Sequence, residues 1–212
     1  FHRLAPRPAS ANAGFPRRLS ETGLFADTPS ARPSPGVVPY SINAEAWADG
    51  ATAERLLALP DASTLAIEDR QNPQQGFIRG KFRVPDGGVL VKTLSVDTTP
   101  GMPGGERRVE TQLLHADRGY WRAYAYRWND AQTDAELVDA EGTTVSLEIA
   151  DAVDPAVRHR REHRIVSRTE CLTCHSSRGG TLYGFVPAQL RRPVPDGRGG
   201  TVEQLEAFAT HG

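Results

Sequence analysis

Between residue 37 and about residue 166, short segments with the composition of β-strands alternate with turn residues such as Gly, Pro and Asp. Short strands and turns at this spacing are typical of antiparallel sandwiches and barrels. The expected strands are residues 55–60, 63–68, 89–96, 107–114, 120–128, 136–139 and 143–149. We therefore predict a mainly β fold, with a β-sandwich-like domain over residues 37–166.

The segment at residues 120–128 shows the clearest alternation of side chains. Its even positions, from Tyr120 to Trp128, are mostly aromatic, whereas its odd positions include Ala123 and Ala125. Alternate residues of a strand face opposite sides of a sheet, so the aromatic side chains should share one face. We expect that face to pack in the core, with the lining of a cofactor pocket as the alternative. Residues 129–134 should form a hairpin turn.

The two ends of the chain differ from this middle part. Residues 1–36 are rich in Pro, Ala, Ser and Arg, which predicts a linker or an extended arm. A short island at residues 19–25 is apolar enough to dock on the core. Residues 167–212 are predicted to be a helical segment packed on the β domain.

Two capping-box patterns mark the expected helices of this last segment. Ser167 with Glu170 precedes a helix that should carry residues 171–175 and end near residues 179–180. Thr201 with Gln204 predicts a second, amphipathic helix over residues 201–210.

Both cysteines of the chain lie in one motif, Cys171-Leu-Thr-Cys174-His175. Cys-x-x-Cys-His is the attachment signature of c-type haem. One helical turn separates the two thiols, so each can bond one vinyl group of the same porphyrin, and the next residue directs its imidazole at the iron. The motif therefore predicts one covalent haem c, held by Cys171 and Cys174, with His175 as the proximal iron ligand.

Three other uses of these cysteines remain open from the sequence. A thioredoxin-like dithiol would need a parallel βαβ context, which the preceding β-rich pattern does not supply. A zinc site needs four ligands, usually from two separated pairs; there is no second cysteine pair, and His159 with His163 is only a loose substitute for one. A plain disulfide is the third alternative.

The sixth ligand of the iron is less constrained. Met102, the only methionine, lies in a Pro/Gly-rich loop and is a candidate distal ligand, since a thioether opposite histidine suits an electron carrier. Lys92, His115, His159 and His163 are the other candidates. An open sixth position would favour catalysis or gas sensing instead.

Charge and hydropathy exclude some partners. The net charge of −1 gives no overall attraction to nucleic acid, and no apolar run approaches the ~20 residues of a membrane helix. The basic run at residues 158–164 should be a solvated strand or loop, with pairing to haem propionates or to an acidic redox partner as the alternative. Phe1 is not an initiator, so we expect a processed or excerpted chain, and the missing signal peptide carries no conclusion about location.

Several stretches around these features resemble a family of exported, mostly uncharacterised bacterial c-type cytochrome proteins. The matching stretches are residues 19–25, 38–44, 47–51, 89–94, 108–114, 124–135 and 167–176. In that family the haem region is often joined to a sugar-dehydrogenase-like β-propeller, and a second Cys-x-x-Cys-His segment often follows. The resemblance implies a periplasmic or cell-surface redox protein whose β region and haem segment form one unit. It also implies that Cys171, Cys174 and His175 bind the haem, and Lys92 belongs to a recurrent motif.

We therefore predict a one-electron carrier with redox protein partners, among them other haem domains or subunits of one assembly. An enzyme or gas sensor with an open distal site is the first alternative. A binding module with a zinc or disulfide Cys/His site is the second.

Overall fold

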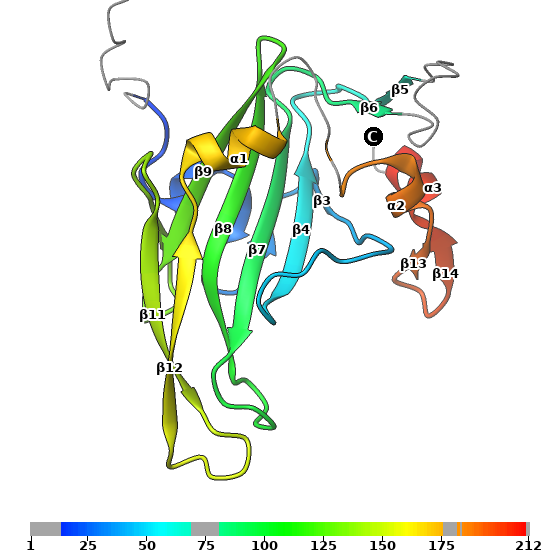
Figure 1. Cartoon of the computed structure of the whole chain (residues 1–212). Coiled ribbons are helices and arrows are strands. Elements are labelled where there is room, and N and C mark those ends of the chain that lie inside the picture. The colour runs from blue at the N-terminus through cyan, green and yellow to red at the C-terminus, as the bar shows by residue number, and fades with distance from the viewer. Residues whose placement is uncertain (1–13, 69–80, 176–181, 183, 211–212) are drawn as a thin grey trace, which may run out of the picture.

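The centre of the molecule is a six-stranded antiparallel sheet (Figure 1). A computed structural model describes residues 14–68, 81–175, 182 and 184–210. The strands lie in the order β10-β9-β8-β7-β4-β3. Their bounds are β3 (Val37–Pro39), β4 (Thr52–Ala58), β7 (Val89–Asp97), β8 (Glu106–Asp117), β9 (Tyr120–Trp128) and β10 (Ala135–Leu137). The predicted mainly β fold is confirmed.

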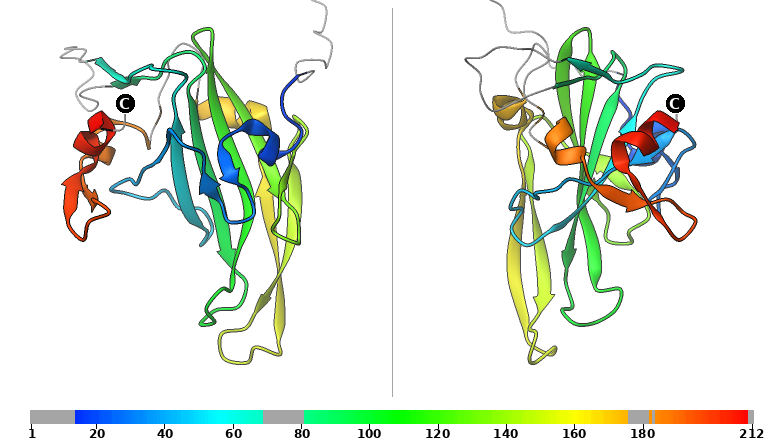
Figure 2. Two further views of the ribbon diagram at one scale, coloured as in Figure 1. Left: turned by 180° about the vertical axis from the view of Figure 1, so that it is seen from behind. Right: turned by 90° about the vertical axis from the view of Figure 1, so that its right-hand side faces the viewer.

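The N-terminal segment covers one face of this sheet (Figure 2). It contains η2 (Leu19–Thr22), β1 (Phe25–Asp27) and β2 (Arg32–Pro33). Leu19 is fully buried and packs with Leu24 and Phe25 in one cluster with Tyr126 and Trp128 of β9. The expected docking of residues 19–25 is confirmed, and so is the core packing of the aromatic face of β9.

A second layer covers the opposite face (Figure 1). It consists of the hairpin of β11 (Thr143–Ala150) and β12 (Arg158–Ile165), followed by helix α1 (Arg168–Cys174). Leu147 and Ile149 of β11 pack on a buried cluster that includes Val96 and Val109 of the sheet. Two antiparallel sheets packed face to face make the domain sandwich-like, as predicted.

The C-terminal residues lie beyond the edge of the sheet that β3 and β4 form (Figures 1 and 2). They form α2 (Pro187–Leu190), β13 (Pro193–Pro195), β14 (Thr201–Glu203) and α3 (Gln204–Thr210). The prediction of one helix over residues 201–210 is wrong at its start, because Thr201 pairs with Pro195 in a small hairpin. Gln204 does not complete a capping box. Its buried side chain accepts a hydrogen bond from Ser41 N at 2.7 Å instead.

The expected strands at residues 55–60 and 63–68 do flank a turn, in which Ser63 N donates to Pro60 O at 3.0 Å. They are not partners of one another, however. β4 pairs with β7, whereas β5 (Ala66–Glu68) pairs with β6 (Lys81–Arg83). No helix among the described residues has the length and apolarity that crossing a membrane requires.

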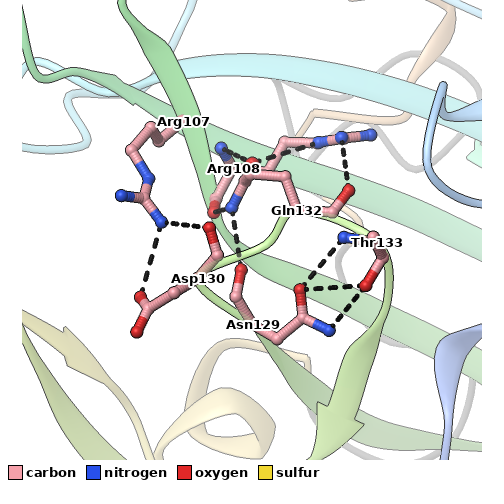
Figure 3. A network of polar contacts seen from close by, with 6 residues as sticks. All are labelled: Arg107, Arg108, Asn129, Asp130, Gln132 and Thr133. Atoms are coloured by element: carbon pink, nitrogen blue, oxygen red, sulfur yellow. Dashed lines mark hydrogen bonds and ion pairs between the residues drawn. The ribbon is translucent and has the colours of Figure 1, made fainter.

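The turn between β9 and β10 is the hairpin that the sequence predicts (Figure 3). Asn129 Oδ1 accepts from Thr133 N at 3.0 Å inside the turn. Arg107 donates to Asp130 O at 2.7 Å and Arg108 N donates to Gln132 Oε1 at 2.8 Å, so β8 fixes the turn from the side. The polar residues of this turn are therefore used in local hydrogen bonds.

Candidate haem site

Helix α1 carries the cysteine motif and begins at the predicted capping box. Ser167 Oγ accepts from Glu170 N at 3.2 Å, while Glu170 Oε2 accepts from Ser167 N at 3.0 Å. The helix ends at Cys174, with His175 as its C-cap, which is earlier than expected. Residues 179–180, the predicted stop, lie outside the described residues. Cys171 and Cys174 are thus one helical turn apart, as the haem motif requires.

Both cysteines are free thiols. Cys171 is half-buried and Cys174 is exposed. Burial raises the pKa of the Cys171 thiol, and the carboxyl groups of Glu110 and Glu170 raise it further. Reactive dithiols of the thioredoxin kind need a lowered thiol pKa, so the surroundings of Cys171 oppose that alternative.

A cavity of about 590 Å³ lies between α1 and the sheet. Cys171, Cys174 and His175 all line it from the helix side. Strands β4, β7, β8 and β9 form the opposite wall, and residues 40–47 with residues 182, 184 and 185 complete it. Sites for small molecules and cofactors have volumes of about 300–1,000 Å³, so the cavity has the size that a cofactor needs.

Apolar side chains dominate the sheet wall at one level. Cross-strand partners in an antiparallel sheet share a face, and Leu57, Leu90, Leu114 and Ala123 are successive partners across β4, β7, β8 and β9. Three of these four residues line the cavity, all but Leu57. The face of β9 that carries Ala123 therefore lies on the cavity side, and Tyr124 of the aromatic face lines the cavity as well.

A row of polar residues lies beside this apolar row, two positions away from it on each strand. Arg55, Lys92 and Gln112 are successive partners across β4, β7 and β8, and all three line the cavity. Arg55 is buried and donates to Glu45 Oε1 at 2.7 Å. Burial lowers the pKa of the Lys92 side chain, and the positive charge of Arg55 lowers it further, against the opposing effects of Glu110 and Glu45.

A buried acid–histidine pair lies next to this row. His163 Nε2 and Glu110 Oε2 are 3.0 Å apart, and both residues are buried between β12 and β8. Gln112 Nε2 donates to the other carboxyl oxygen of Glu110 at 3.0 Å. Sequence reasoning treated His163 only as a possible metal ligand and missed Glu110. The alternate positions of Glu110 and Gln112 on the predicted strand 107–114 place both on one face of the sheet, which was the available signal.

Apart from Lys92, the side chains that the sequence suggested as the sixth iron ligand do not line the cavity. Met102 is 64% exposed in the loop between β7 and β8, at the end of the sheet far from α1 (Figure 1). His115 lies near Phe15, with ring centroids 6.3 Å apart, and His159 contacts Asp151 at 3.0 Å. None of these residues, nor His163, lines the cavity, whereas Lys92 does.

The basic run at residues 158–164 lies in strand β12. The sequence predicted a solvated strand or a loop here, and the structure has the strand. Arg160 contacts Glu162 at 2.7 Å, and Arg164 contacts Glu170 of α1 at 2.6 Å. All four side chains are well exposed. The second contact ties the end of β12 to the first turn of the helix that carries the motif.

Comparisons of the chain with protein-family models, with curated proteins and with solved structures find no match. Among the described residues, no group of three or more His, Cys, Asp or Glu side chains is placed to hold a metal ion. The residues of the cavity fit a covalent haem in three respects: two thiols one turn apart, an adjacent imidazole, and a largely apolar space of suitable volume beside them.

Proposed function

We propose that this chain is a c-type cytochrome that transfers single electrons between redox proteins outside the bacterial cytoplasm. One covalent haem would be held by Cys171 and Cys174 through thioether bonds, with His175 as the proximal ligand of its iron. The observation that carries the proposal is the meeting of all three motif residues at one wall of a cofactor-sized cavity.

A haem bound here would supply a one-electron iron couple, whose potential depends on the axial ligands, the burial and the nearby charges. The residues of the chain set those conditions. Leu90, Leu114 and Phe185 keep water from the inner part of the cavity. The buried Arg55 places a positive charge beside it, and Glu45 fixes the position of that charge.

The outer part of the site suits exchange with a partner protein. Cys174 is exposed, and Trp47, which also lines the cavity, is 84% exposed. The site therefore opens to the surface at its helix side. A redox partner that docks there would reach the cofactor without entering the fold.

A pyridine haemochrome spectrum of the denatured protein tests the cofactor. The protein is produced with the c-type maturation machinery, next to the variants Cys171→Ser and Cys174→Ser. We expect the wild type to give the band of haem with two saturated vinyl groups, and each single variant to give the shifted band of a haem with one thioether. A properly matured wild type without covalent haem would refute the proposal, and metal analysis for zinc would then be the next measurement.

Electron transfer needs its own test. Potentiometric titration of the matured protein should give a reversible one-electron transition. Export is tested separately by fractionating cells that express the protein from its complete natural gene, where we expect haem-stained protein in the periplasm or on the cell surface. A cytoplasmic haem-free pool as the only product would contradict the proposed location.

A further inference from the structure

The cavity wall opposite α1 contains one polar group whose placement is not explained by packing. Lys92 is the middle member of the polar row, between Arg55 and Gln112, and its strand is otherwise mostly buried and apolar. Lysine is rarely placed on a buried wall unless it is paired. The contacts of its two neighbours decide what Lys92 can bind.

Both neighbours already have partners. Arg55 donates two hydrogen bonds to the carboxylate of Glu45, and Gln112 donates to Glu110. Lys92 has only longer-range charge interactions with Arg55, Glu110 and Glu45, and its amine forms no hydrogen bond or ion pair with any of the described residues. The amine therefore lines the cavity without a hydrogen-bond or ion-pair partner among the described residues.

The chemistry of the side chain also suits a ligand. The lysine nitrogen can bind a metal once it is deprotonated, since only then does it carry a lone pair. Lys92 brings this nitrogen to the cavity wall from the middle of the polar row.

The other side chains that line the cavity are poorer ligands. Burial raises the pKa of the Tyr40 phenol, so its phenolate is disfavoured. The Glu170 carboxylate is used by Ser167 in the capping box and by Arg164. Met102 and the histidines considered from the sequence do not line the cavity.

We propose that Lys92 is the sixth ligand of the haem iron, so that the site is closed by a lysine amine from β7 opposite His175. The inference rests on the proposed cytochrome function and deepens it. A closed, six-coordinate iron suits electron transfer, whereas an open position would suit catalysis or gas sensing.

The test uses matured, haem-loaded protein and three variants. Lys92→Arg keeps a long basic side chain but cannot bind iron, and Lys92→Met offers a thioether instead. Met102→Ala is the matched control at the other predicted ligand. The readouts are the optical and electron paramagnetic resonance spectra of the ferric protein, the midpoint potential and the affinity for cyanide.

We expect wild type and M102A to share one low-spin spectrum with two nitrogen ligands. K92R should become high-spin, and K92M should show a raised midpoint potential, because methionine ligation favours the reduced iron. A ligand that holds the sixth position about 99% of the time weakens cyanide binding about 100-fold, so K92R should bind cyanide about 100-fold more tightly.

Two results would overturn the inference while leaving the cytochrome proposal intact. The first is a haem-loaded K92R with the spectrum and cyanide affinity of the wild type. The second is a high-spin wild type, which would mean an open position and favour the enzyme or sensor alternative. If K92R does not accumulate, the wild-type spectrum and K92M still decide. Absence of covalent haem from the wild type is a different failure, since it refutes the proposed function itself.

Discussion

The buried pair of Glu110 and His163 should be a major source of stability. Glu110 is 2% exposed and His163 is 8% exposed, with Nε2 and Oε2 3.0 Å apart. His163→Leu keeps the volume but leaves one carboxyl oxygen without its partner. An unsatisfied buried polar group costs about 1–3 kcal/mol, and an unpaired buried charge about 3–5 kcal/mol. Gln112 still donates to the other carboxyl oxygen of Glu110. We therefore expect H163L to lower the free energy of unfolding by about 3 kcal/mol, the value at which these two ranges meet.

Urea unfolding measures this loss, and a double variant tests its cause. If the unpaired carboxyl is the cause, removing it as well should restore stability, because apolar replacement of a buried pair is often neutral or stabilising. Glu110→Leu/His163→Leu should then be more stable than His163→Leu alone. His159→Leu is the matched control, since His159 contacts Asp151 at the surface, where such pairs are worth at most about 1 kcal/mol. A double variant less stable than H163L would show that this reasoning is wrong.

Three further predictions concern the framework of the site. Leu19→Ala should cost about 2–5 kcal/mol in urea unfolding, because Leu19 is fully buried in the docked N-terminal segment. Gly142→Ala should destabilise more than Gly119→Ala, although both have a positive φ; only at Gly142 would a Cβ lie 2.4 Å from a backbone oxygen, that of Ile165. Equal losses in the two alanine variants would contradict the crowding. Hydrogen bonds from two neighbouring arginines hold the pKa of Asp117 at about 2, below its ordinary 3.8. The contribution of Asp117 to stability is thus complete above pH 3.8 and lost as the pH falls through 2, which an NMR titration of its carboxyl would check.

The elements of this fold that depend on local sequence could be predicted. Alternation and turn residues located β7, β8, β9 and β11 to within a few residues, and the capping box located the start of α1. Strand pairing was less accessible. β4 and β5 are separated by one turn, yet they belong to different sheets, because β4 ends at Ala58 and pairs with β7, which begins only at Val89.

The two sides of the proposed haem site also differ in how far local sequence predicts them. The helix side follows from the motif alone, since the spacing of Cys171, Cys174 and His175 is a property of one helical turn. The sheet side depends on register. Lys92 and Met102 lie ten residues apart on the same hairpin, and only the position of α1 over the sheet distinguishes them. Composition made Met102 the more attractive ligand because it is the only methionine.

The position of α1 is in turn set by long-range contacts. A helix of two turns is unstable alone, so it must be held by its surroundings. Arg168 N at its start donates to Ala140 O at 2.9 Å, and the strand before it is anchored by the buried Ile165 and by the contact of His163 with Glu110. Loss of the His163 contact should therefore loosen the helix wall of the cavity as well as the sandwich. If His175 and Lys92 bind one iron between these walls, the haem-loaded H163L should be more stable than the haem-free H163L, because iron ligation stabilises only the folded arrangement that brings the two residues together.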